Sequence, residues 1–354
     1  MTSAPHLPGA LEPPVLEVED LRVHLLRGGN SVTIVDGVSF VVAPASSTAL
    51  VGESGAGKSV TVRAVLGLLD DRRFKVTGSV RYGGVDVLAL PTKERRRRIS
   101  SFASLVFQDP TRSLNPTMRV GWQVAEAMMI SEDESKRLDK DEAKKRSVQL
   151  LRDVGIADPE ERFFAYPHQL SGGMRQRVVI AIALSCQPRI IFCDEPTSSL
   201  DVTTQALIMD LLDTLREHYG ISVVLITHDL ALASSRVDDV MVMYAGRLVE
   251  SLPAVTLFDN ASMPYTRALL RAVPDPEAPV LMRPLPPALD RGSAVGGLCV
   301  YTSQCERAQQ KCLDASPELR ELEPGHWCRC WFPGAFDGVE PAAAVSGRIE
   351  VVSS

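Results

Sequence analysis

The sequence predicts an α/β protein with a nucleotide-binding core, a mostly helical insertion and a small cysteine-bearing module near its C-terminal end. A short apolar segment, Ser47–Val51, runs directly into the glycine-rich segment GESGAGKS at 52–59 and then into a helical segment, Val60–Leu69. Strand, glycine loop and helix in this order are the context that a phosphate-binding loop requires. Farther along, Arg189–Asp194 and Ser222–Thr227 are short, rich in β-branched residues and bounded by polar turns, which is typical of buried parallel strands.

Composition and charge exclude several classes of protein. The 354 residues are 45% apolar and 23% charged, as expected for a globular protein with one large domain and an appendage. The net charge of −6 argues against nucleic acid as a partner, because binding to a phosphate backbone normally needs a basic surface. The apolar segments are far shorter than the roughly 20 residues that cross a bilayer, and no secretory signal is visible at the start. We therefore expect a protein of the cytosol.

The expected organisation along the chain follows from changes in pattern and composition. Val15–Val23 and Ile34–Val42 alternate apolar and polar residues, as antiparallel strands with one solvated face do. From Met263 onward prolines become frequent and the aliphatic periodicity fades. We expect a flexible tail at 1–14, a nucleotide-binding domain at 15–262 with a helical insertion at about 110–167, a C-terminal module at 263–336 and a flexible tail at 337–354.

The glycine-rich loop carries the residue types that bind a nucleoside triphosphate. Its glycines free the backbone so that successive N–H groups converge on phosphate oxygens, and the following helix adds its positive end. Lys58 can reach the β- and γ-phosphates, and the hydroxyl of Ser59 can bind Mg²⁺. The alternative is a chance glycine-rich turn, which the strand and helix on either side argue against. We expect the nucleotide to be bound by Gly52, Ser54, Gly55, Ala56, Gly57, Lys58, Ser59 and Val60.

Two acidic residues, Asp194 and Glu195, follow the apolar strand Ile190–Cys193. Parallel sheets place ligand-binding residues at this end of a strand. An aspartate there suits Mg²⁺, and a second acid beside it can polarise the attacking water. An ordinary solvated Asp-Glu pair in a turn is the alternative, and the phosphate loop upstream favours the catalytic interpretation.

Gln108 and His228 also follow short apolar segments, at 105–107 and 222–227. His228 can approach the γ-phosphate as a hydrogen-bond donor. A lone histidine or glutamine at a strand end is more often structural than catalytic. The order of the motifs nevertheless favours a role in catalysis for both residues.

The segment LSGGMRQR at 170–177 predicts a second anion site. Ser171, Gly172 and Gly173 are small residues at the start of a helix, where backbone N–H groups and the helix dipole favour an anion. Two phosphate-binding helix starts are too many for one nucleotide. The second is therefore expected to serve a nucleotide that another subunit holds.

Across Leu16 to about Glu250, these motifs resemble the nucleotide-binding subunits of ABC transporters. The resemblance implies a P-loop ATPase fold with a RecA-like core, an antiparallel β subdomain and a helical subdomain. It makes GESGAGKS the Walker A loop and IIFCDE the Walker B strand. It makes Gln108 the Q-loop residue, which binds Mg²⁺ together with Ser59 and Asp194. Asp201 becomes part of the D-loop, and His228 becomes the switch histidine. In that family, each ATP lies between the Walker A loop of one domain and the LSGGM signature of its partner.

Two further segments, VFQDPTRSLNPTMRVGWQVAE and YAGRLVESLPAVTLFDNASMPYTRALLRAVP, narrow the resemblance to the ATPases of oligopeptide and dipeptide importers. Such subunits work at the cytoplasmic face of the membrane with a similar second ATPase, two permeases and an extracytoplasmic solute-binding protein. An importer for nickel or another small solute is an alternative, because related ATPases share these motifs. A soluble ABC ATPase of DNA repair or translation is a further alternative, although the insertion is too short for an extended coiled coil.

Five cysteines cluster near the C-terminal end of the chain. In a reducing cytosol such clustering favours metal or cluster ligation over disulfides, and by ligand type alone [4Fe–4S] and Zn²⁺ are equally suited. Unligated thiols in a loop are the remaining alternative. The importer resemblance implies an iron–sulfur cluster on Cys299, Cys305, Cys312 and Cys330, with Cys328 as an alternative fourth ligand.

The sequence departs from the ABC pattern at one position that concerns the base of the nucleotide. These domains usually place an aromatic ring on the first sheet to stack on adenine, and the matching position holds Leu25. Its neighbour His24 could substitute weakly. We expect His24 instead to be a strand residue that faces solvent.

Overall fold

A computed structural model describes residues 13–28, 30–131, 133–198, 200–273 and 298–334. The predicted tail at 337–354, nearly all of the tail at 1–14 and part of the predicted module at 263–336 lie outside these residues. Ser199, in the predicted D-loop, does so as well.

The first sheet is antiparallel, as the alternating pattern predicts. Its strand order is β2-β1-β4-β5, and β1 pairs antiparallel with both β2 and β4. Apolar side chains of β1 and β2, such as Leu16, Val18 and Phe40, are buried in one hydrophobic cluster with α1. The strands are β1 (Leu16–Arg27), β2 (Asn30–Val42), β4 (Phe74–Tyr82) and β5 (Val85–Asp86).

The second sheet forms the nucleotide-binding core and has the order β11-β12-β10-β9-β3-β8-β7-β6. The strands from β9 to β6 run parallel. The buried parallel strands predicted at Arg189–Asp194 and Ser222–Thr227 are confirmed as β7 and β8, and the apolar strand predicted at Ser47–Val51 is β3. The remaining strands are β6 (Ala103–Val106), β7 (Ile190–Asp194), β9 (Asp239–Tyr244), β10 (Arg247–Pro253), β11 (Arg320–Glu323) and β12 (His326–Cys328).

The helix after the glycine loop, α1 (Lys58–Val65), begins earlier and ends earlier than the predicted segment Val60–Leu69. Gly67 lies in the left-handed region with φ +63°, and the N–H of Leu68 bonds to the carbonyl of Arg63 at 2.8 Å. This 6→1 hydrogen bond is a Schellman C-cap, in which a glycine ends the helix. The apolar residues beyond it therefore belong to the following turn.

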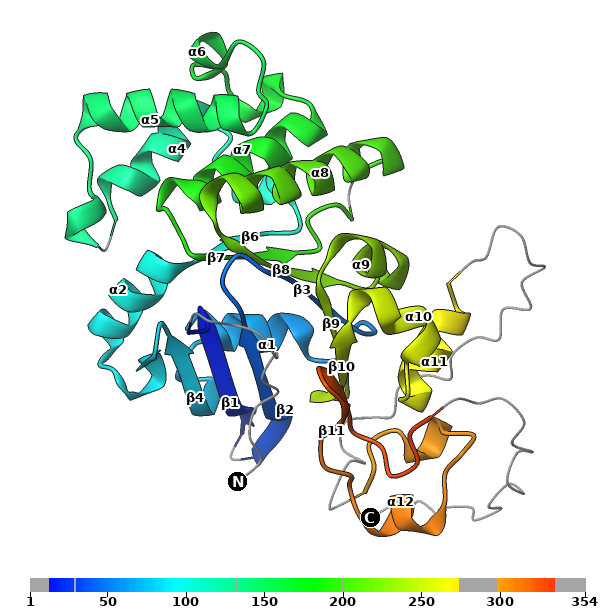
Figure 1. Ribbon diagram of the computed structural model, residues 1–354. Coiled ribbons are helices and arrows are strands. Elements are labelled where there is room, and N and C mark those ends of the chain that lie inside the picture. Colours follow the sequence, from blue (N-terminus) through cyan, green and yellow to red (C-terminus); the bar gives the residue numbers. More distant parts are fainter. Residues whose placement is uncertain (1–12, 29, 132, 199, 274–297, 335–354) are drawn as a thin grey trace.

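Helices between β6 and β7 build a separate layer, seen at the top of Figure 1. They enclose a hydrophobic cluster in which Val124, Leu150 and Phe163 are fully buried. The helices up to α8 are α2 (Thr92–Phe102), α3 (Pro110–Ser113), α4 (Val120–Met129), α5 (Lys140–Asp153), α6 (Pro159–Arg162), α7 (Gly172–Ser185) and α8 (Val202–Tyr219). Short 3₁₀ segments lie at Val87–Ala89, Glu134–Lys136, Pro167–Gln169, Ala254–Thr256 and Thr302–Gln304.

The cysteine-bearing segment is joined to the core sheet. Strand β12 pairs antiparallel with β10, with Cys328 opposite Glu250, so the β11–β12 hairpin extends the sheet (Figure 1). The carboxylate of Glu250 is buried and accepts hydrogen bonds from the N–H groups of Ser262 and Met263, while His326 Nε2 lies 2.9 Å from it. The helices here are α9 (Leu230–Arg236), α10 (Leu257–Asn260), α11 (Pro264–Arg271) and α12 (Gln310–Asp314).

Within the part of the chain that the structure describes, no helix is both long enough and apolar enough to cross a membrane.

Candidate nucleotide-binding site

The glycine-rich loop lies between β3 and α1 and packs closely on β9. Gly52 has φ +145°, and a Cβ atom there would lie 2.2 Å from the carbonyl oxygen of Met243. A larger residue would push the loop away from the sheet, so glycine is required at this position. The loop therefore holds its backbone N–H groups at the carboxyl end of β3, next to the start of α1.

Lys58 turns back over this loop. Its Nζ atom donates to the carbonyl oxygens of Gly52 at 2.6 Å and Glu53 at 2.9 Å. Burial lowers the pKa of Lys58, and the carboxylates of Glu195 and Asp194 act in the opposite direction. A cation beside a row of backbone N–H groups and a helix start fits an anionic triphosphate.

Ser59 and Asp194 form an oxygen pair beside the loop. The hydroxyl of Ser59 donates to Oδ1 of Asp194 at 3.3 Å, joining α1 to the end of β7. Burial raises the pKa of Asp194, which the hydroxyl of Ser59 and the charge of Arg63 oppose. Hydroxyl and carboxylate oxygens are ligands that Mg²⁺ prefers, so this pair fits the predicted metal position.

The carboxylate of Glu195 is held between two side chains from neighbouring strand ends. Gln108, which follows β6, donates from Nε2 to Oε2 of Glu195 at 2.8 Å, and Nδ1 of His228, which follows β8, lies 3.0 Å from Oε1. The backbone of Glu195 has φ +46°, and its N–H donates to Ile226 O at 2.9 Å. A non-glycine residue in this region is strained and indicates a position that its surroundings fix.

The structure thus brings together the three predicted catalytic residues. Gln108, however, directs its amide to Glu195 and to the hydroxyl of Ser198, at 3.1 Å, and not to the Ser59–Asp194 pair. The recorded contacts therefore place Gln108 beside the predicted base, and its role as a Mg²⁺ ligand stays a prediction.

The residues of the predicted signature and D-loop form a second group. Ser171 caps α7 by accepting from the N–H of Met174, and Asp201 caps α8 by accepting from the N–H of Thr204 at 3.0 Å. The hydrogen bonds that Asp201 accepts from the N–H and the hydroxyl of Thr204 lower the pKa of Asp201. A Cβ atom on Gly173 would lie 2.8 Å from Thr204, so the starts of α7 and α8 pack on each other. Among the described residues, no recorded hydrogen bond joins Ser171 or Asp201 to the phosphate loop.

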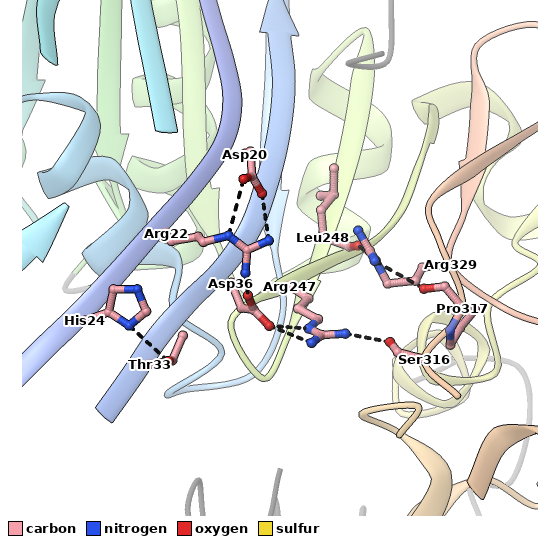
Figure 2. Close-up of polar contacts among 10 residues, drawn as sticks. All are labelled: Asp20, Arg22, His24, Thr33, Asp36, Arg247, Leu248, Ser316, Pro317 and Arg329. Atoms are coloured by element: carbon pink, nitrogen blue, oxygen red, sulfur yellow. Dashed lines mark hydrogen bonds and ion pairs between the residues drawn. The ribbon is translucent and has the colours of Figure 1, made fainter. Parts of the chain in front are cut away.

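The predicted adenine position lies on the first sheet. His24 is half-buried, and its Nδ1 atom lies 3.0 Å from the hydroxyl of Thr33 on the neighbouring strand (Figure 2). Leu25 pairs with Val32 on one side and Phe74 on the other. His24 is a residue of strand β1, as expected, and none of the described contacts tests which residue meets adenine.

Four of the five C-terminal cysteines, Cys299, Cys305, Cys312 and Cys330, line one pocket. Burial, together with the neighbouring thiols, raises the pKa of Cys305 to about 12 and that of Cys330 to about 11. Cys328 does not line this pocket and is fully buried in the cluster under β10. In the described ranges, no group of three or more His, Cys, Asp or Glu is arranged to hold a metal ion.

Sequence reasoning missed two residues that touch the site. Ser198 accepts from Gln108, and the hydroxyl of Tyr265 accepts from the N–H of Glu53 at 3.0 Å. Ser198 lies three residues before Asp201 of the predicted D-loop, so its position in the sequence was a usable signal. Tyr265 lies 212 residues from Glu53, and nothing in the sequence pattern links the two.

Comparison with known families gives the class of the protein. Residues 35–198 match the family model for ABC transporter, and residues 249–312 match that for oligopeptide/dipeptide transporter, C-terminal region. Two solved structures are similar. An ATP-binding cassette dimer in a post-hydrolysis state with ADP and Pi is 25% identical with a TM-score of 0.59, covering 68% of this chain and 98% of its own. The cbiO1 protein of Clostridium perfringens is 27% identical with a TM-score of 0.60, over 70% and 91% of the two chains.

Curated relatives are similar over most of the chain. The dipeptide transport ATP-binding protein DppD of Haemophilus influenzae is 40% identical over 313 residues, 87% of this chain and 92% of its own. The oligopeptide transport ATP-binding protein OppD of Mycobacterium tuberculosis is 43% identical over 319 residues, 90% of this chain and 52% of its own, so this chain spans about half of that relative. The chain therefore belongs to the ATP-binding proteins of ABC transporters, in their oligopeptide/dipeptide group, and is an ATPase.

Proposed function

We propose that this chain binds and hydrolyses ATP to power an ABC importer for dipeptides or oligopeptides. The observation that carries the proposal is the convergence of Gln108 and His228 on the carboxylate of Glu195, beside the phosphate loop. The similarity to oligopeptide and dipeptide transport proteins supports the substrate class.

The phosphate loop and the start of α1 bind the triphosphate. Backbone N–H groups from Gly52 to Val60 surround its oxygens, and Lys58 exchanges its contacts with the loop carbonyls for the β- and γ-phosphates. Ser59 and Asp194 would hold Mg²⁺, and Gln108 would be a further ligand. When bound, Mg²⁺ would neutralise the charge that develops on the phosphates.

Glu195 accepts a hydrogen bond from the attacking water and polarises it toward the γ-phosphate. Gln108 and His228 keep its carboxylate turned toward the loop, so that it is oriented before the nucleotide arrives. His228 is largely exposed, with 64% of its side chain accessible, and can turn to donate to the γ-phosphate. These roles stabilise the transition state and position the water.

A second ATPase subunit completes each site in this proposal. Ser171, Gly172, Gly173 and Asp201 form a separate group with its own helix starts, and they serve the ATP that the partner holds. The partner is a similar but distinct ATPase, giving a heterodimer. Two membrane permeases hold the pair at the cytoplasmic face of the cell membrane, and an extracytoplasmic solute-binding protein delivers the peptide to them.

The C-terminal cysteines are proposed to hold a [4Fe–4S] cluster with a structural role. Four thiols around one pocket match the ligand set of such a cluster. A single Zn²⁺ on the same four thiols is the alternative, because Zn²⁺ also takes four thiolate ligands. Cys330 is the proposed fourth ligand, because Cys328 is buried away from the pocket.

The test is reconstitution of the chain with its second ATPase and both permeases in lipid vesicles. ATP hydrolysis is expected to rise when the solute-binding protein is added with a peptide and to stay low when it is added empty. Stimulation by a Ni²⁺-loaded binding protein alone would replace the peptide assignment with the nickel alternative. A chain that purifies without permeases and is stimulated by DNA or ribosomes would overturn the transport proposal.

A further inference from the structure

The phosphate loop has a contact from the C-terminal segment of the chain. The backbone N–H of Glu53 donates to the hydroxyl of Tyr265 at 3.0 Å. Tyr265 is the second residue of α11 and is fully buried. The contact therefore joins the start of the loop to a helix residue that belongs to neither of the two sheets.

The same residue of the loop also contacts Lys58. The carbonyl of Glu53 accepts from Lys58 Nζ at 2.9 Å, while its N–H donates to Tyr265. Glu53 is thus fixed on both sides, by the tyrosine and by the lysine that is to bind the phosphates. A shift of Glu53 would move one of the two carbonyls on which Lys58 rests.

The position of Tyr265 is itself strongly determined. Its ring packs against those of Tyr244 on β9 and Tyr301, with centroid distances of 4.5 and 5.5 Å, and the latter two rings meet edge-on at 5.3 Å. Two residues before Tyr265, the N–H of Met263 donates to the buried carboxylate of Glu250. A buried hydroxyl on a ring held in this way offers a fixed acceptor.

We propose that Tyr265 is a positioning residue of the ATPase, which sets the start of the phosphate loop and, through Glu53, the resting place of Lys58. It does not touch the nucleotide. The loop thereby depends on the docking of α11, and three residues near this contact, Met263, Pro264 and Tyr301, also line the cysteine pocket. The proposal requires nothing to be bound in that pocket.

The experiment compares Tyr265→Phe with Tyr301→Phe in the full chain. Both changes keep the packed ring and remove one hydroxyl, but only the first removes the acceptor of the Glu53 N–H. For Tyr265→Phe we expect the Kd and KM for MgATP to rise about two- to tenfold with kcat nearly unchanged, as loss of one neutral hydrogen bond predicts. Tyr301→Phe is expected to match the wild type.

Three results with these variants would overturn the proposal. The first is unchanged ATP affinity in Tyr265→Phe. The second is a fall in kcat without a rise in KM, which indicates a smaller folded fraction and a merely structural tyrosine. The third is equal weakening of ATP binding in both variants, which would assign the effect to the ring cluster and not to the hydroxyl.

A second measurement needs no variant and covers the case in which Tyr265→Phe does not fold. Hydrogen exchange of the Glu53 amide in the nucleotide-free wild-type chain is expected to be slowed well below the rate of an unstructured peptide. Exchange at the unstructured rate would show that the hydrogen bond is not maintained in solution and would overturn the proposal.

Discussion

Nδ1 of His228 lies 3.0 Å from Oε1 of Glu195, across the gap between the ends of two parallel strands. With Gln108 on the other oxygen, the carboxylate is oriented from two sides. These contacts fix the carboxylate of Glu195 at the carboxyl end of β7.

Glu195→Gln is expected to keep ATP binding and to lower kcat by about 100-fold or more, because an amide cannot accept a proton from the attacking water. Steady-state hydrolysis and equilibrium binding of ATP measure the two effects separately. Glu217→Gln, the same change at an exposed position on α8, is the control and should hydrolyse ATP normally. Near-normal turnover in Glu195→Gln would end its assignment as the polarising base.

Ser59→Ala is expected to raise the Mg²⁺ concentration that supports half-maximal hydrolysis, because it removes one oxygen of the Ser59–Asp194 pair. A Mg²⁺ titration of ATPase activity checks this. Binding of ATP without Mg²⁺ should change little and serves as the internal control. An unchanged Mg²⁺ titration would show that the hydroxyl is not a ligand.

Cys330→Ala is expected to abolish iron binding, whereas Cys328→Ala should keep it, because only the first side chain lines the pocket. Iron and sulfide content and absorbance near 400 nm, an approximate expectation for thiolate-bound clusters, are measured after anaerobic purification. Both variants remove one thiol, at positions two residues apart, so each is the control for the general effect of losing a cysteine in this segment. A colourless wild-type protein that contains zinc would refute the cluster.

Asp239→Asn is expected to stabilise the fold at pH 8. Burial, with the charge of Asp238, raises the pKa of Asp239 to about 6. The folded-state pKa therefore lies above the unfolded one, so the contribution of Asp239 to stability is present at low pH and is lost as the pH rises through about 6. The Tm gain of the variant should be largest above pH 7 and fade toward pH 4. Equal Tm gains at pH 4 and pH 8 would contradict this assignment.

Much of the site could be predicted because its signals are local. The loop at 52–59 sits between a strand and a helix, and the rule that ligands bind at the carboxyl ends of parallel strands predicts that residues after β6, β7 and β8 meet. Gln108, Glu195 and His228 do meet there. The end of α1 was predicted too late, because the pattern of apolar residues continues past the glycine that caps the helix.

The rest depends on contacts between distant parts of the chain. Glu53 and Tyr265 are 212 residues apart, and only the packing of α11 on β9 brings them together. Strand β12 has three residues, too few to show an alternating pattern, so its pairing with β10 could not be predicted. The choice between Cys328 and Cys330 likewise depends on which thiol reaches the pocket.

The hairpin β11–β12 covers strand β10 of the core sheet. Strand β12 pairs with the backbone of β10, and the N–H of Arg329 bonds to Val249 O at 2.8 Å just beyond the last paired residues. A cassette cut off before Met263 would leave β10 as an edge strand and Glu250 without the N–H of Met263 and the ring of His326. Exposed strand edges pair with other chains. We therefore expect residues 320–329 to protect the ATPase against aggregation, independently of what the cysteines beside them bind.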